Sequence, residues 1–154
     1  MTTGGLKMTF KRILCCVDFS SNAESAFKAS LDMAVKYGST LHLLHVLPPV
    51  VNPLITDIDI VIPEANSAAL VPKVEAKMQE VYAGRIDSSM KYVISVKNGH
   101  VSSEILNYLL DETIDLVILG AYGLSGVELV LFGSVAKRIA HKAPCSVMIV
   151  REKK

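Results

Sequence analysis

Glycine and serine residues around one apolar run form the pattern in this sequence that could do chemistry. Gly120 and Gly123 follow the run at residues 115–119, and Gly133 directly precedes Ser134. Glycines at the end of a strand let the backbone turn sharply and approach a ligand closely. A Gly-Ser pair at the start of a helix offers unpaired N–H groups and a hydroxyl, which suit phosphate. The pattern therefore indicates a phosphate site; the alternative is that these are ordinary turn and helix-end glycines.

The elements that must position this motif alternate between strands and helices. Apolar and β-branched runs predict strands, and apolar residues at helical spacing predict helices. The expected strands cover residues 12–17, 40–47, 90–96, 115–119 and 145–150. The expected helices run from Ser21 to Gly38, up to about Ala83, from Ser102 to Asp111 and from Ser134 to His141. Ser21 and Glu24 have the spacing of a capping box at the start of the first helix.

Five strands joined by helices predict an α/β fold with a single doubly wound five-stranded parallel sheet and helices on both faces. The expected strand order is 3-2-1-4-5. Ligands bind such sheets beyond the carboxyl ends of the strands, where the winding reverses. In this order that point lies between the first and fourth strands, so residues 16–20 and 120–123 would face each other across one crevice.

Length and composition predict one domain in a reducing compartment. The 154 residues are 51% hydrophobic with a net charge of +1, and the mean hydropathy is +0.40. We expect a domain at 11–151 with short tails at 1–10 and 152–154. No apolar run reaches the ~18 residues of a membrane span, and the charge balance argues against a nucleic-acid surface. Three cysteines without a C-x-x-C pair, and no signal peptide, predict a cytoplasmic protein.

The segment at about 49–71 is too long for an ordinary connection between a strand and a helix. It mixes apolar residues with two aspartates and three prolines. Two interpretations remain open. The segment is either a surface excursion that packs its own apolar side chains, or a lid or oligomer contact.

The polar strand ends and the glycine motif together resemble the universal stress protein family, and the resemblance extends from Lys11 to Val150. The matching positions are Val17-Asp18-Phe-Ser20, Leu44-His-Val46, Asn98-Gly99-His100, and the motif G-x2-G-x9-G-S followed by Ala143-Pro144-Cys145. Family members that keep the glycine motif bind ATP, and members that lack it do not. This chain keeps every fixed position, so the resemblance implies the ATP-binding class and an adenine nucleotide alpha hydrolase-like fold. Tyr122 departs from the pattern, because family members often carry a basic residue there.

The resemblance implies a role for each matching position. Asp18 would accept hydrogen bonds from the ribose hydroxyls, while Cys16 and Val17 would border the adenine and the Val46 backbone would read its polar edge. The ribose and phosphates would be held by residues after the fourth strand and at the start of the last helix: Gly120, Gly123, Gly133, Ser134 and Val135. Leu119, at the end of the fourth strand, is a further implied contact of the nucleotide. The ligand would be ATP, or AMP or ADP, with any Mg²⁺ or Mn²⁺ held mainly by the phosphates. The alternative for Asp18 is that it only caps the helix near Ser21.

Three functions remain open. The first is a cytosolic adenine-nucleotide-binding regulator or stress-response factor, with slow or no hydrolysis. The second is an enzyme of the same fold that hydrolyses ATP or transfers a group from it, and the third is a dimeric scaffold without nucleotide. The chain has no G-x4-G-K-[ST] motif and no carboxylate pair after a strand, which efficient phosphoryl transfer usually requires. We therefore assign no catalytic and no metal-ligating residue.

The last strand, Cys145 to Val150, is an apolar edge strand in the expected order. An open apolar edge tends to pair with another chain unless something covers it. Two copies related by a two-fold axis could pair these strands antiparallel and cover both edges. We expect a homodimer through this strand, and the resemblance implies the same contact.

Overall fold

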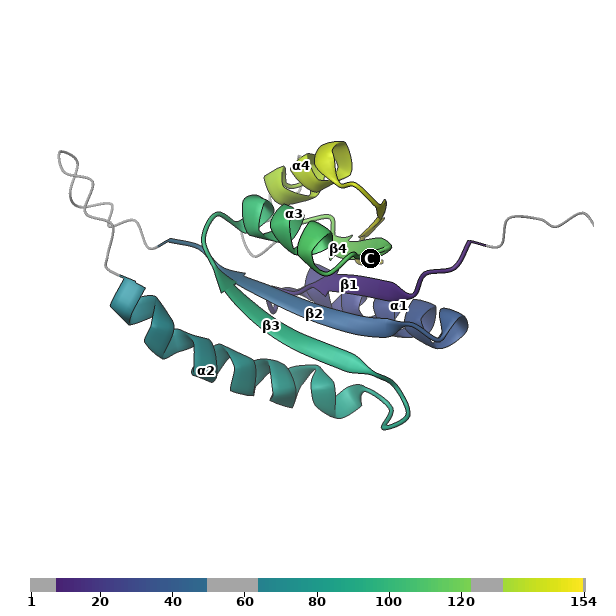
Figure 1. Cartoon of the computed structure of the whole chain (residues 1–154), viewed down its shortest axis with the longest axis horizontal. Helices are drawn as coiled ribbons and strands as arrows, with labels where there is room; N and C mark the ends of the chain where they lie inside the picture. The colour runs from purple at the N-terminus through teal and green to yellow at the C-terminus, as the bar shows by residue number, and fades with distance from the viewer. Residues whose placement is uncertain (1–7, 50–63, 123–131, 154) are drawn as a thin grey trace, which may run out of the picture.

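Strands and helices alternate along the chain in the computed structural model, which describes residues 8–49, 64–122 and 132–153. In chain order the elements are β1 (Arg12–Cys16), α1 (Ser21–Tyr37), β2 (Thr40–Leu47), α2 (Glu64–Val81), the 3-10 helix η1 (Ala83–Arg85), β3 (Tyr92–Asn98), α3 (Val101–Asp111), β4 (Leu116–Gly120), α4 (Ser134–Lys142) and β5 (Ser146–Val150). The strands form one sheet between two layers of helices (Figure 1).

The sheet has five parallel strands in the order β3-β2-β1-β4-β5. This confirms the predicted fold class and strand order. The winding reverses at β1, because the chain proceeds outward from β1 to β2 and β3 and then returns to add β4 and β5 on the other side. The predicted switch point between β1 and β4 is therefore present.

Both faces of the sheet are covered, which explains the high mean hydropathy. Alternate residues of each strand contribute to two separate cores. Ile13 and Cys15 of β1 pack with residues of α1 and α2, whereas Leu14 packs with residues of α3 and α4. Figure 1 shows α3 and α4 on one side of the sheet and α2 on the other. Ile13, Leu14 and Cys15 of β1 are fully buried, so the strand that leads to the candidate site is anchored in both cores.

Helix α1 begins directly after β1 and has a well-formed cap at each end. The Ser20 hydroxyl accepts a hydrogen bond from the Ala23 N–H at 3.1 Å, which satisfies one of the free donors of the first turn. At the other end Gly38 has a φ of 64°. This left-handed conformation suits glycine and ends the helix, as the sequence predicted.

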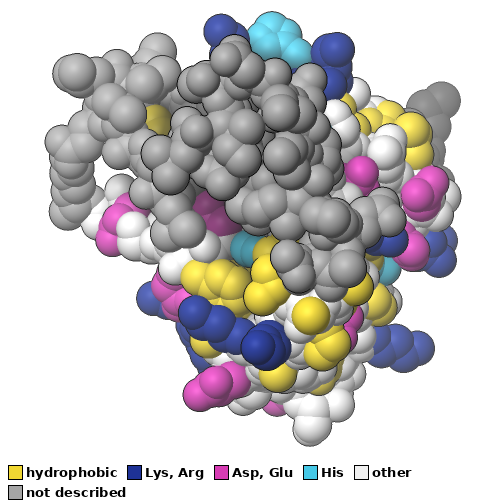
Figure 2. Space-filling view, turned by 90° about the vertical axis from the view of Figure 1, so that its left-hand side faces the viewer, with side chains coloured by type: hydrophobic (Ala, Val, Ile, Leu, Met, Phe, Trp, Pro, Cys, Tyr) yellow, Lys and Arg dark blue, Asp and Glu magenta, His cyan; other side chains and the backbone are white. Residues whose placement is uncertain are grey.

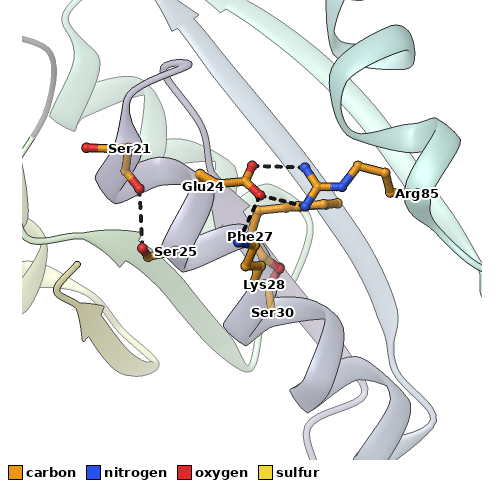
Figure 3. Close-up of polar contacts among 7 residues, drawn as sticks. All are labelled: Ser21, Glu24, Ser25, Phe27, Lys28, Ser30 and Arg85. Atoms are coloured by element: carbon orange, nitrogen blue, oxygen red, sulfur yellow. Dashed lines mark hydrogen bonds and ion pairs between the residues drawn. The ribbon is translucent and has the colours of Figure 1, made fainter. Parts of the chain in front are cut away.

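The predicted capping box at Ser21 and Glu24 is wrong. The cap is Ser20, one residue earlier, and the Glu24 carboxylate instead accepts two hydrogen bonds from Arg85 of η1, at 2.9 and 2.5 Å (Figure 3). The Arg85 guanidinium also lies 4.8 Å from the centre of the Phe27 ring. A bidentate charged partner outcompetes a backbone N–H, and it comes from a segment 61 residues away that local spacing does not reveal.

Element boundaries differ from the prediction by one or two residues in most places. β3 begins at Tyr92 and continues to Asn98, which is two residues later at both ends than expected. The predicted excursion at 49–71 is only partly covered, because residues 50–63 lie outside the described residues. Its last part, from Glu64, belongs to α2. Pro72 lies inside this helix.

None of the helices in the described ranges combines the length and the hydropathy that a membrane span requires.

Candidate functional site

The candidate site lies at the carboxyl ends of the strands, where β1 separates from its neighbours. Pairing of β1 with β4 ends at Cys15 and Ile118, and pairing of β1 with β2 ends at Cys16 and Leu44. The chain after Cys16 therefore leaves the sheet between β2 and β4. Figure 2 faces this end of the sheet, with Lys, Arg and His side chains at its top over α4.

Asp18 lies half-buried two residues beyond β1. Its Oδ1 atom accepts hydrogen bonds from the Ser20 N–H at 3.0 Å and from the Ser20 hydroxyl at 2.5 Å. Its Oδ2 atom forms no hydrogen bond within the described residues. Because Ser20 is the N-cap of α1, the alternative that Asp18 itself caps this helix is wrong. One carboxylate oxygen supports the turn, and the other can bind a ligand.

The backbone of Val46 faces the gap that β1 leaves. The Val17 N–H donates to the Leu44 carbonyl at 2.9 Å, so Leu44 faces β1. Backbone groups of a strand face the same neighbour at every second residue, so those of Val46 also face the β1 side, beyond the last β1 pair. Neither group has a hydrogen-bond partner there within the described residues. This N–H and C=O pair can read the polar edge of a planar ring.

Two of the predicted apolar contacts belong to the cores. The Val17 side chain is 4% exposed on the α1 and α2 side, and Leu119 is 3% exposed on the α3 and α4 side. The Val17 carbonyl also accepts a hydrogen bond from Nδ1 of His45 at 2.7 Å. Cys16 is half-buried and faces the α3 and α4 side. Of these three, Cys16 has the most exposed side chain.

The cysteines next to the site are unsuited to redox chemistry. Burial raises the pKa of Cys15 to about 12, and burial also raises the pKa of Cys16 well above its usual value. Thiols with raised pKa values stay protonated at neutral pH, and the thiolate is the reactive form. Both residues therefore act as small apolar side chains on opposite faces of the sheet, as the sequence indicated.

Gly120 ends β4 against the start of α1. A Cβ at this position would lie 2.7 Å from the Cβ of Asn22 and 2.9 Å from its carbonyl carbon. Close helix packing therefore requires glycine here, a reason that sequence reasoning missed when it considered only ligand approach. Gly123 lies outside the described residues.

Gly133 is the N-cap of α4 and is tied to the end of β4. Its N–H donates to the Ala121 carbonyl at 2.7 Å, and an added Cβ would lie 3.3 Å from that oxygen. The Lys137 N–H donates to the Gly133 carbonyl at 3.0 Å, which closes the first turn. The N–H groups of Ser134 and Val135 precede that bond, and the N-cap Gly133 has no side chain that could cap them. These N–H groups form the positive end of α4 and suit an anion.

The structure brings the sequence-predicted residues of β1, β2 and β4 to one edge of the sheet, with the start of α4. Sequence reasoning missed Phe19 and Tyr82, whose rings stack at 5.6 Å. No spacing signal relates these residues, because they lie on distant segments. Within the described ranges, no group of three or more His, Cys, Asp or Glu side chains could hold a metal ion.

The chain belongs to the universal stress protein family, whose model matches residues 9–151. It is 24% identical to the universal stress protein YxiE of Bacillus subtilis, over 92% of this chain and 99% of that protein. Among solved structures, it is 25% identical to the hypothetical protein MJ0577, with a TM-score of 0.78 over 96% of this chain and 99% of the other. The universal stress protein UspA from Lactobacillus plantarum is also 25% identical, with a TM-score of 0.71 over 94% and 99%.

Two more distant structures of the same fold hold adenine nucleotides. A universal stress protein in complex with cAMP is 16% identical with a TM-score of 0.59, over 94% of this chain and 98% of that one. The universal stress protein from Archaeoglobus fulgidus in complex with dAMP is 17% identical with a TM-score of 0.57, over 93% and 99%. At these identities the likeness to this chain is one of fold.

Proposed function

We propose that this chain is an adenine-nucleotide-binding regulator that takes ATP, or ADP or AMP, in the crevice beyond β1 and β4. The observation that carries the proposal is that the two carboxylate oxygens of Asp18 have different surroundings. One oxygen holds the turn through Ser20, while the other has no hydrogen bond within the described residues. A carboxylate oxygen with unused acceptor capacity can make charge-assisted hydrogen bonds to vicinal ribose hydroxyls.

The neighbouring strand supplies a candidate reader of the base. The N–H and C=O of Val46, which have no hydrogen-bond partner among the described residues, lie beside the point where β1 leaves the sheet. Adenine presents a donor and an acceptor side by side, so one N–H and one C=O can pair with both. Guanine presents a different pattern at the same edge. We therefore propose that the site prefers ATP to GTP.

The phosphates would extend toward the start of α4. The Gly133 N–H donates to the Ala121 carbonyl. The N–H groups that follow it, in the first turn of α4, favour negative charge. Gly123 completes the glycine motif in sequence and belongs to the same proposal. A divalent ion would be held mainly by the phosphates, because the described residues near the crevice offer one carboxylate, Asp18.

Two functional alternatives remain, and neither has a specific observation in its favour. An efficient phosphoryl-transfer enzyme needs a positioned base and cations on the phosphates, and the chain lacks the P-loop motif. We propose slow or no hydrolysis. The fold with two adenine-nucleotide complexes among its solved structures supports a ligand site rather than an empty scaffold.

We also propose a homodimer through β5. The Ser146 N–H donates to the Asp115 carbonyl and the Val150 carbonyl accepts from the Ala121 N–H, both on the β4 side. Because backbone groups alternate along a strand, those of Val147 and Ile149 face outward from the sheet edge. Val147 and Ile149 are half-buried. A two-fold antiparallel pairing of two such edges would satisfy the outward N–H and C=O groups of both copies.

Calorimetric titration tests the nucleotide proposal directly. The protein is first freed of bound nucleotide by unfolding and refolding, and mass spectrometry identifies what is released. ATP, ADP, AMP and GTP are then titrated separately. We expect binding of ATP and weaker binding of GTP. Absence of binding heat for every adenine nucleotide, in protein that refolds fully, would remove the proposed function.

A further inference from the structure

Phe19 follows Asp18 in a backbone conformation that is unfavourable for an aromatic residue. Its φ is 65°, and among the described residues other than glycine only Thr113, at 48°, also has a positive φ. Residues with a Cβ rarely adopt this region, because the Cβ approaches the backbone carbonyl. Contacts outside the turn must therefore hold Phe19 in place.

Side chains from two other parts of the chain enclose the Phe19 ring. The ring stacks on Tyr82 with 5.6 Å between centres and 27° between planes, and it lies 5.2 Å from the His45 ring of β2. The Lys77 ammonium of α2 lies 4.7 Å from the ring centre, within the range of a cation–π contact. Tyr82 is itself fixed, because it is 1% exposed and packs 5.0 Å from Phe27.

Tyr82 is a buried and uncharged partner for the Phe19 ring. Burial raises the pKa of the Tyr82 hydroxyl to about 12, so the hydroxyl is protonated at neutral pH. The stacking of the two rings therefore does not change with pH near neutrality.

The position of Phe19 decides whether Asp18 and Ser20 can meet. Both hydrogen bonds of Asp18 Oδ1 come from Ser20, and Phe19 is the single residue between them. If Phe19 left the left-handed region, Ser20 would turn away from Asp18. The carboxylate would then lose the bonds that fix its orientation, and Oδ2 would no longer be held in one direction.

We propose that Phe19 is a positioning residue of the nucleotide site, whose ring, held by Tyr82 and His45, fixes the direction of the Asp18 carboxylate. The inference rests on the proposed function, because the group that Phe19 positions is the proposed ribose ligand. It also ties the site to α2, which supplies Lys77 and leads into Tyr82.

The first test compares Phe19→Leu with Phe10→Leu as a matched control. Phe10 also packs against an aromatic ring, that of Tyr37 at 5.1 Å, but it precedes β1 at the opposite end of the sheet. We expect the Kd for ATP to rise about tenfold in Phe19→Leu and to change by less than about twofold in Phe10→Leu. Equal affinities in the two variants would overturn the inference.

A double-mutant cycle separates positioning from general destabilisation. If Phe19 acts through Asp18, Phe19→Leu should change ATP affinity by less than about twofold in an Asp18→Ala background. A loss as large as in the wild-type background would contradict the inference. Should Phe19→Leu fail to fold, Tyr82→Leu serves in its place, because it removes the ring that stacks on Phe19 and keeps an apolar side chain in the buried position.

Amide hydrogen exchange of the ligand-free protein distinguishes this inference from the proposed function. The Ser20 and Ala23 N–H groups donate within the turn, so they report on it directly. We expect their exchange to be faster in Phe19→Leu than in Phe10→Leu. If the wild type binds no nucleotide and exchange is faster, only the proposed function fails. Unchanged exchange overturns the inference, whether or not the protein binds nucleotide.

Discussion

Asp18 shows at the scale of one residue what sequence reasoning can and cannot decide. Its position after the first strand made it a candidate ligand, and the choice between ribose contact and helix cap stayed open. The two adjacent serines, Ser20 and Ser21, both fit a helix start, so local spacing selected the wrong one. The structure assigns the cap to Ser20 and leaves Oδ2 of Asp18 without a hydrogen bond in the described residues.

Replacing Asp18 by alanine should weaken ATP binding by roughly 1–3 kcal/mol, the range of a lost hydrogen bond to a charged group. Asp18→Asn keeps an oxygen that can accept from Ser20 and removes the charge. We expect it to keep the wild-type melting temperature and to lose part of the affinity. Calorimetry and thermal unfolding on both variants check this. A loss of stability with no loss of affinity would mean that Asp18 serves only the turn.

Gly120→Ala should destabilise the fold by about 1–3 kcal/mol, the usual cost of overpacking a rigid contact. The new Cβ would meet the Asn22 backbone, which cannot move without displacing α1. Gly84→Ala is the matched control, because its new Cβ would have a nearest neighbour at 3.9 Å. Denaturant unfolding measures both. Equal stability of the two variants would show that the α1 backbone at Asn22 can shift to accommodate the new Cβ.

At the level of secondary-structure elements, helix α1 is held in place by contacts that no local sequence pattern predicts. Its apolar face and its end at Gly38 followed from spacing alone. The partner of Glu24 did not, because Arg85 belongs to η1 after α2. Phe27 lies beneath both the Arg85 guanidinium and the Tyr82 ring. The helix therefore connects to the segment that positions Phe19.

The Glu24 and Arg85 pair should add about 1 kcal/mol or less to the free energy of unfolding at neutral pH, because both side chains are partly exposed to solvent. The Arg85 hydrogen bonds lower the pKa of Glu24 below 4.5. A lowered folded-state pKa gives stability that is present above the unfolded value and is lost as the pH falls through the folded value. Glu24→Gln should thus be less stable than wild type at pH 7, and the difference should vanish in acid. Urea unfolding across this pH range measures it, and a difference that persists unchanged below the lowered pKa would contradict the assignment.

The fold of the whole molecule was predictable because every strand and helix agreed with one alternating pattern. Five buried strands with intervening helices allow few arrangements, and the observed order is the expected one. The length of α2 was less predictable, since Pro72 falls inside it. Contacts such as Phe19 on Tyr82 depend on the tertiary structure and leave no periodic signal in the sequence.

The proposed homodimer through β5 concerns the whole molecule. Val147→Pro would remove an N–H that faces the open side of β5 and would leave the bonds to β4 in place, since Ser146 and Val150 bond to the β4 side. We expect the wild type to sediment as a dimer and the variant as a folded monomer. Analytical ultracentrifugation decides between these. A monomeric wild type at high concentration, or a variant that remains a stable dimer, would remove β5 as the interface.

The central claim is that the crevice at the start of α4 binds an adenine nucleotide, and titration of ATP into wild type and Gly133→Val tests it most directly. The valine side chain would project beside the Ala121 carbonyl, next to the helix N–H groups that we propose bind phosphate. Circular dichroism confirms that the variant keeps its fold. The account predicts binding by the wild type and none by Gly133→Val. Undiminished binding by the folded variant would contradict it.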